Sequence, residues 1–146
     1  MPRPHKTFPV ELPEYDHLCD IDEDLIQLIE TMNRFGFHTV ASCQEFKPGA
    51  AMVEVREDIF QWRGRRMFNQ LIEAIEDAMG ILAEAHSPGR DCMFLLQKEL
   101  LRGVVDDRSG VIIDCEASRR VRKGDLDRAR RDAIEALEAA LRKRTE

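Results

Sequence analysis

A chain of 146 residues, of which 43% are hydrophobic, can bury one continuous core of ordinary domain size. The formal net charge of -6 at pH 7 argues against a protein that coats nucleic acid, because binding to phosphates requires concentrated positive charge. No run reaches the roughly 18 apolar residues of a membrane helix, and the first residues lack the apolar stretch of a signal peptide. We therefore expect a cytoplasmic protein that does not contact a membrane.

The first part of the chain divides into an arm and a helix. Residues 1–20 are rich in proline and are predicted to form an irregular arm, whereas residues 21–146 are predicted to form a single α/β domain. Apolar residues recur at helical spacing from Ile21 to Met32. Asp20 and Glu23 are typical of a capping box at the start of this helix, and Gly36 marks its end.

Two pairs of strands, each followed by a helix, come next in the chain. Residues 37–42 and 51–57 are predicted to be strands joined by a loop that contains Lys47, Pro48 and Gly49. A long helix is predicted over residues 65–85, two further strands over 92–97 and 111–115, and a last helix over 125–143. The last helix is expected to bury an apolar stripe of Leu126, Ala129, Ala133, Ile134, Leu137 and Leu141.

The resulting order, α-ββ-α-ββ-α, predicts an α+β fold. We expect a two-layer sandwich in which a four-stranded, mostly antiparallel sheet carries three helices on one face. Residues 72–79, IEAIEDAM, parallel residues 134–141, IEALEAAL, which indicates an internal duplication. The other sheet face would lack a cover and carries apolar residues such as Val40 and Met52, so a homodimer is also predicted.

The expected topology brings the cysteines together. If each helix runs antiparallel to its neighbouring strand, one edge of the sheet, here called the top edge, receives the end of strand 37–42. The same edge would receive His17 and the basic cluster 119–123, which contains Arg119, Arg120 and Arg122. All four cysteines are predicted at this edge: Cys19, Cys43, Cys92 and Cys115.

Three interpretations of these cysteines stay open at this point. They are free thiols of ordinary core packing, weak candidates for a metal site, or, for Cys43, a ligand contact or a reactive thiol. The pattern contains no C-x-x-C pair, so it favours no particular metal or cofactor.

The Ser-Cys stretch and the basic cluster form the candidate site. Residues 42–45, SCQE, follow a short apolar run, and the cluster 119–123 precedes the last helix, whose amino-terminal N–H groups could help to hold an anion. The alternative for the cluster is a solvated run of charge. The predicted ligand-binding residues are Ser42, Cys43, Gln44, Glu45, Arg119, Arg120 and Arg122, and no catalytic residue is predicted.

Residues 21–57 resemble a loose group of small bacterial and phage proteins with the motif T-x-x-S-C-[QE]. More distantly, the order helix, strand, Ser-Cys is similar to the wybutosine-synthesising tRNA methyltransferases, which use S-adenosylmethionine. Ser42 and Cys43 match the methyltransferase motif, but Gln44, Glu45 and Phe46 replace the Gly and Arg that follow it there. The resemblance implies a two-layer α/β fold built by duplication and a functional edge at Ser42 and Cys43.

These observations favour a small binding or adaptor protein over an enzyme. The expected partner is an anionic small molecule or a nucleotide, and nucleic acid is less favoured because of the negative net charge. One alternative is an S-adenosylmethionine-dependent methyltransferase-like protein that acts on nucleic acid. The other is a structural or assembly subunit.

Overall fold

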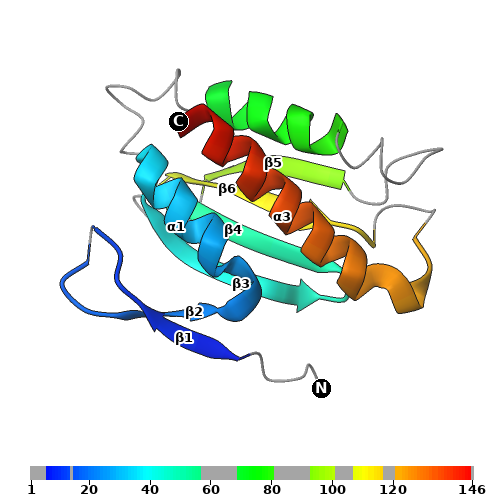
Figure 1. Ribbon diagram of the computed structural model, residues 1–146, viewed down its shortest axis with the longest axis horizontal. Helices are drawn as coiled ribbons and strands as arrows, with labels where there is room; N and C mark the ends of the chain where they lie inside the picture. Colours follow the sequence, from blue (N-terminus) through cyan, green and yellow to red (C-terminus); the bar gives the residue numbers. More distant parts are fainter. Residues whose placement is uncertain are drawn as a thin grey trace.

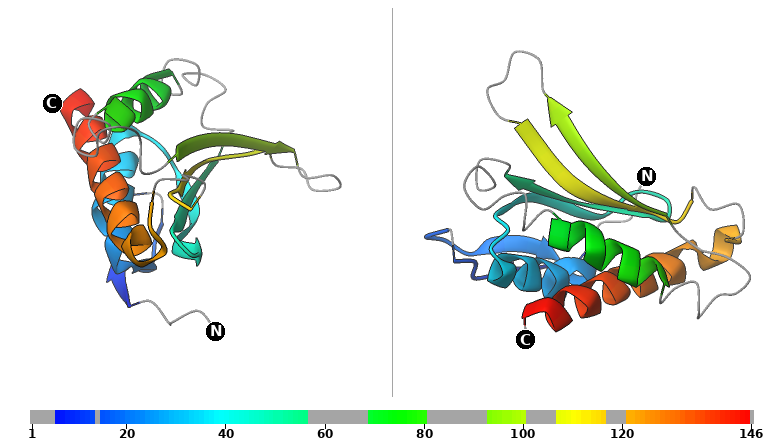
Figure 2. Two further views of the ribbon diagram at one scale, coloured as in Figure 1. Left: turned by 90° about the vertical axis from the view of Figure 1, so that its right-hand side faces the viewer. Right: turned by 90° about the horizontal axis from the view of Figure 1, so that it is seen from above.

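The computed structural model describes residues 6–13, 15–56, 69–80, 93–100, 107–116 and 121–145. Within these ranges the chain forms two layers, a twisted antiparallel sheet and a layer of helices that lies on one of its faces (Figures 1 and 2). The predicted α+β class is therefore confirmed. None of the helices in the described ranges is long and apolar enough to cross a membrane.

The main sheet contains four strands in the order β3-β4-β6-β5, and all neighbours are antiparallel. The strands are β3 (Thr39–Lys47), β4 (Ala50–Arg56), β5 (Met93–Leu100) and β6 (Asp107–Asp114). The central positions belong to β4 and β6, so β3 and β5 are the two edges. The β3 edge becomes important below.

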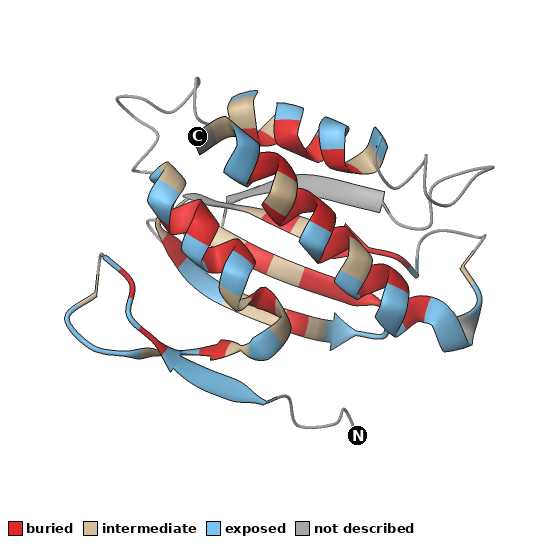
Figure 3. Ribbon diagram, in the orientation of Figure 1, coloured by how far each residue is buried: buried red, intermediate tan, exposed pale blue. Residues whose placement is uncertain are grey.

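The helix layer consists of α1 (Ile26–Phe35), the helix at residues 69–80, and α3 (Leu126–Thr145). Alternate residues of the central strands face these helices, because side chains of a strand point to opposite faces in turn. The predicted apolar face of the last helix is confirmed, and Figure 3 shows buried residues recurring along the helices and along the central strands. The core includes Val53, Val55, Val111 and Ile113 from the sheet and Leu28, Met32, Leu71, Leu137 and Leu141 from the helices.

The chain repeats one pattern twice. A hairpin of β3 and β4 precedes the helix at 69–80, and a hairpin of β5 and β6 precedes α3. Each hairpin supplies one edge strand and one central strand, and β4 pairs with β6 at the centre. The arrangement agrees with the repeated pattern in the sequence, whereas its origin by duplication stays a prediction.

The amino-terminal arm is not irregular, and the sheet described above is not the only one. Strands β1 (Thr7–Val10) and β2 (Cys19–Asp22) pair antiparallel in a second, two-stranded sheet. Pro9 is tolerated there because a strand at a sheet edge can lack one N–H partner. Val10, Leu12 and Ile21 are buried and fix the arm to the body.

The first helix begins later than predicted. Strand β2 continues to Asp22, a 3-10 turn occupies Glu23–Leu25, and α1 starts only at Ile26. The predicted capping box of Asp20 and Glu23 does not form, because Asp20 lies within β2 and the N-cap position belongs to Asp22. The Asp22 carboxylate does not cap the turn and accepts a hydrogen bond from the backbone N–H of Gln44. The helix does end at Gly36, whose φ of 108° lies in the left-handed region that glycine adopts without strain.

The prediction of a loop at the Ser-Cys stretch is wrong. Strand β3 runs through residues 42–45 to Lys47, and the chain reverses at Pro48 and Gly49, where Gly49 has a φ of 74°. The register against β4 shifts twice, between Thr39 and Ala41 and between Cys43 and Lys47. These irregularities absorb the extra residues of β3, so a polar stretch remains within the strand.

Candidate functional site

Ser42 and Cys43 lie on opposite faces of the main sheet. Ser42 pairs with Val53, whose side chain is in the core beneath the helices, and Cys43 pairs with Met52, which points to the other face. Opposite residues of an antiparallel pair share a face, and successive residues alternate. The hydroxyl and the thiol therefore do not line one cavity together.

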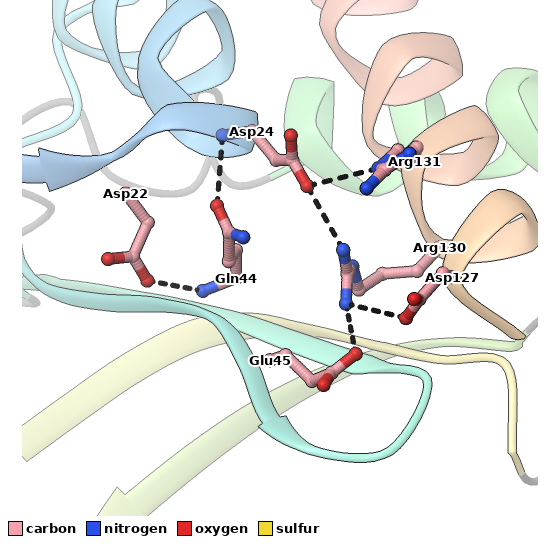
Figure 4. A network of polar contacts seen from close by, with 7 residues as sticks. All are labelled: Asp22, Asp24, Gln44, Glu45, Asp127, Arg130 and Arg131. Carbon is pink, nitrogen blue, oxygen red and sulfur yellow. Dashed lines mark hydrogen bonds and ion pairs between the residues drawn. The ribbon is translucent and has the colours of Figure 1, made fainter. Parts of the chain in front are cut away.

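Gln44 and Glu45 are held by contacts inside the fold. The Gln44 side-chain carbonyl accepts a hydrogen bond of 3.0 Å from the backbone N–H of Asp24, and the backbone N–H of Gln44 donates to the Asp22 carboxylate over 2.8 Å. The Glu45 carboxylate pairs with the guanidinium of Arg130 (Figure 4). Both side chains therefore connect β3 to the helix layer.

Arg130 is the centre of this polar network. Its side chain is only 3% exposed, and its guanidinium contacts Asp24 over 3.0 Å, Glu45, and Asp127 over 3.4 Å. Arg131, which is largely exposed, reaches the same Asp24 oxygen over 3.4 Å. A buried cation surrounded by carboxylates joins the start of α1, β3 and α3, and it leaves little positive charge for an anionic ligand.

The sequence contained a signal for Arg130 that the pattern analysis missed. Arg130 is four residues from both Leu126 and Ile134, so it lies on the buried face of α3 rather than on its solvent face. A lone arginine on an apolar stripe requires a buried acidic partner.

The basic cluster 119–123 is described only in part. Arg119 and Arg120 lie outside the described residues, and Arg122 is exposed just before the 3-10 turn Lys123–Asp125. The Leu126 side chain after this turn packs against Gly49 in the β3–β4 turn. An anion site formed by Ser42–Glu45 with Arg119, Arg120 and Arg122 stays a prediction.

The predicted meeting of cysteines at the top edge is wrong for Cys19. Cys115 does lie there, because its N–H donates to the Gly49 carbonyl over 2.9 Å. Cys19 instead lies beside the beginning of β3, at the opposite end of that strand, and Cys92 is outside the described residues. Within the described ranges, no three His, Cys, Asp or Glu side chains are grouped so that they could hold a metal ion.

A cavity of about 540 Å³, here called the arm cavity, lies between residues 12–21 and the first half of β3. Its floor contains the buried side chains of Leu12, Ile21 and Ile29. Around the floor lie Tyr15, His17, Leu18, Cys19, Asp20, Thr39, Val40, Ala41 and Ser42. Of the predicted ligand-binding residues in the described ranges, Ser42 alone contributes to it.

Tyr15 is fixed at the wall of the arm cavity. Its hydroxyl donates a hydrogen bond of 2.9 Å to the carbonyl of Thr39, and its ring packs edge-on against His17 and His38 at centroid distances of 5.5 and 5.3 Å. One end of the cavity therefore has a rigid aromatic wall that links the arm to β3.

The electrostatic character of the arm cavity is mildly acidic. Asp20 and His17 line the cavity, and the Asp16 carboxylate contacts the His17 ring. A hydrogen bond with the His17 ring lowers the pKa of the Asp16 carboxyl below its ordinary value. Asp16 therefore keeps its negative charge to a lower pH than a free aspartate does.

A second cavity of about 440 Å³, here called the helix cavity, lies between α1 and α3. Four carboxylates line it, those of Glu23, Asp24, Glu135 and Glu138, together with Arg131. Glu138 is buried and accepts a hydrogen bond of 3.0 Å from Thr31. Asp24, Arg131 and Glu138 already have partners in the fold, so the helix cavity is the weaker candidate for a ligand site.

Comparison with known proteins does not assign this chain to a family. No family model, curated protein or solved structure matches the chain.

Proposed function

We propose that this protein is a non-catalytic binding module and that the arm cavity is its ligand site. The observation that carries the proposal is a cavity of about 540 Å³ with an apolar floor and a few polar groups at its rim. Ligand sites in proteins combine these properties and measure roughly 300–1,000 Å³. Ser42, one of the predicted ligand-binding residues, lines this cavity, whereas the other residues of the proposed site differ from the predicted ones.

The lining favours an uncharged or cationic ligand over an anion. The charged side chain of the lining is Asp20, with His17 beside it, and the neighbouring carboxylate is Asp16. The buried guanidinium of Arg130 is already surrounded by carboxylates. An anion would therefore meet repulsion at the arm cavity.

The arrangement of Cys19 and His17 supports binding rather than catalysis. The Cys19 thiol lies 3.9 Å from the backbone oxygen of His17, not beside its imidazole, and the imidazole contacts Asp16. A nucleophilic cysteine requires a base within hydrogen-bonding reach of its sulfur. A homodimer through the helix-free face of the main sheet, where Met52 and Cys43 lie, stays a prediction.

Methyl NMR of the full chain tests the proposal. We expect cationic and apolar fragments to shift the δ1-methyl signals of Ile21 and Ile29, which line the arm cavity. Ile26 and Ile134 line the helix cavity and serve as matched controls that should change little. Fragments that shift the control pair more strongly, or a broad fragment set that shifts neither pair, would show that the arm cavity is not the site.

A further inference from the structure

We propose that the ligand of the arm cavity is an extended polypeptide segment that adds as a strand to the outer edge of β3. This inference rests on the proposed function and specifies its ligand class. Strand addition supplies affinity through main-chain hydrogen bonds and specificity through alternate side chains. The argument concerns the edge, its two fixed points and the chemistry of its rim.

The outer edge of β3 has no strand partner among the described residues. The main sheet ends at β3, and β2 pairs with β1 on its other side and makes no ladder with β3. Figure 1 shows β2 beside β3 without joining the main sheet. The arm cavity lies beside the first half of β3, whereas the end of β2 approaches β3 closely at Asp22, whose carboxylate accepts from the Gln44 N–H over 2.8 Å. An entering segment would therefore pair with β3 alone, before this contact.

Two side-chain contacts mark the ends of the open stretch. The Tyr15 hydroxyl donates a hydrogen bond to the backbone carbonyl of Thr39. The Asp22 carboxylate accepts one from the backbone N–H of Gln44. Between these two contacts lie Val40, Ala41, Ser42 and Cys43. Backbone groups alternate sides along a strand, so we expect the N–H and C=O of Ser42 to face outward, as the N–H of Gln44 does.

The open stretch contains no charged residue and no proline, although the register shift between Thr39 and Ala41 lies at its beginning. Natural edges carry charged residues, especially lysine, or proline, which discourage pairing with another chain. Residues 40–43, VASC, contain none of these. An uncharged edge next to a cavity is suited to receive a strand.

The rim indicates which segment fits. Leu18 is 60% exposed and Val40 is 39% exposed, and both line the arm cavity, so the partner is expected to present apolar side chains to them. The carboxylates of Asp16 and Asp20 add negative charge at the same place. Charge complementarity then favours a segment in which apolar and basic residues alternate.

Binding of synthetic hexapeptides to the full chain tests this inference. The probe is acetyl-(Lys-Val)3-amide, with two comparison peptides: one in which alternate backbone nitrogens are methylated, and one with Glu in place of Lys. We expect the Lys-Val peptide to bind at least about tenfold more tightly than either, because methylation removes the N–H donors along one edge of the first and the second meets the acidic rim. Equal affinity of the methylated peptide would overturn strand addition.

Three variants locate the bound peptide. Val40→Ser and Leu18→Ser should each weaken binding severalfold, whereas Phe46→Ser, which changes a 43% exposed side chain on the same strand outside the cavity, should not. Thermal melting of all three confirms that they are folded. Equal losses in the three variants would contradict the proposed location.

The remaining outcomes separate the two proposals. If fragments shift the Ile21 and Ile29 methyl signals but the Lys-Val peptide does not bind, strand addition is wrong and the binding function stands. If neither fragments nor peptide act at the arm cavity, both are wrong. If the chain dimerises without peptide and Val40→Ser abolishes the dimer while Phe46→Ser does not, the occupant of the edge is a second copy, which overturns the peptide proposal.

Discussion

Replacement of Arg130 by methionine is expected to lower the free energy of unfolding by about 3 kcal/mol. The Arg130 side chain is 3% exposed, and its removal leaves Asp24 and Glu45, whose side chains are only 17% and 26% exposed, without their shared cation. Uncompensated charges in a partly buried site are costly, and methionine replaces the volume but not the charge. Urea denaturation of the variant and the wild type measures the difference.

Arg131→Met is the matched control for this experiment. Arg131 is adjacent in sequence and contacts the same Asp24 oxygen over 3.4 Å, but its side chain is 58% exposed. Exposed ion pairs contribute little, so we expect a change within about 0.5 kcal/mol. Similar stabilities of the two variants would mean that Arg130 is not the connection between β3 and the helix layer.

Gly110→Ala is expected to destabilise the protein by about 3 kcal/mol. A Cβ atom at this position of β6 would lie 2.5 Å from the backbone oxygen of Val53 and 3.1 Å from the Cα of Glu54. The neighbouring atoms belong to the backbone of β4 and cannot rotate away as a side chain can. The two central strands of the main sheet would therefore have to separate locally, which thermal or urea denaturation would detect.

Gly80→Ala provides the opposite result with the same chemical change. Gly80 lies in the helix at residues 69–80, and among the described residues a Cβ there would meet no atom within 4 Å apart from its own helix backbone. Alanine is favoured over glycine in a helix, so we expect a gain of about 0.5–1 kcal/mol. If Gly110→Ala were as stable as the wild type, the close approach of β4 and β6 would be wrong.

Elements with regular periodicity were predicted well. In α3, all six residues of the predicted apolar stripe are buried: Leu126, Ala129, Ala133, Ile134, Leu137 and Leu141. In β4, Ala51, Val53 and Val55 alternate with less buried residues as a two-sided strand requires. Such patterns report directly which face an element buries, and this information suffices for the α+β class.

Irregular elements were predicted poorly for physical reasons. The two register shifts in β3 disturb the alternation of buried and exposed residues, so the strand appeared to end at residue 42. In the arm, β1 and β2 pair across intervening residues, and the proline content hid this pairing. Pairing between separate segments depends on tertiary contacts that composition does not report.

The candidate site was likewise predicted only in part. The sequence directed attention to Ser42, which does line the arm cavity, but not to Leu12, Tyr15 or Ile29, which complete it. These residues meet because the arm folds back beside β3, and local periodicity contains no trace of that contact. Gln44 and Glu45 were predicted to contact a ligand. In a sequence, polar residues that connect two parts of a fold cannot be distinguished from polar residues that bind a ligand.

Native-state amide hydrogen exchange at Ser42 tests the central claim, that the outer edge of β3 is open beside the arm cavity. In the free protein we expect the Ser42 N–H to exchange at least about 100-fold faster than the Val111 N–H of the central strand β6. The Gln44 N–H donates a hydrogen bond of 2.8 Å to the Asp22 carboxylate, so it should exchange more slowly than the Ser42 N–H. Addition of the Lys-Val peptide should slow Ser42 selectively. If the Ser42 N–H of the free protein exchanges as slowly as that of Val111, the edge is already covered and the account is contradicted.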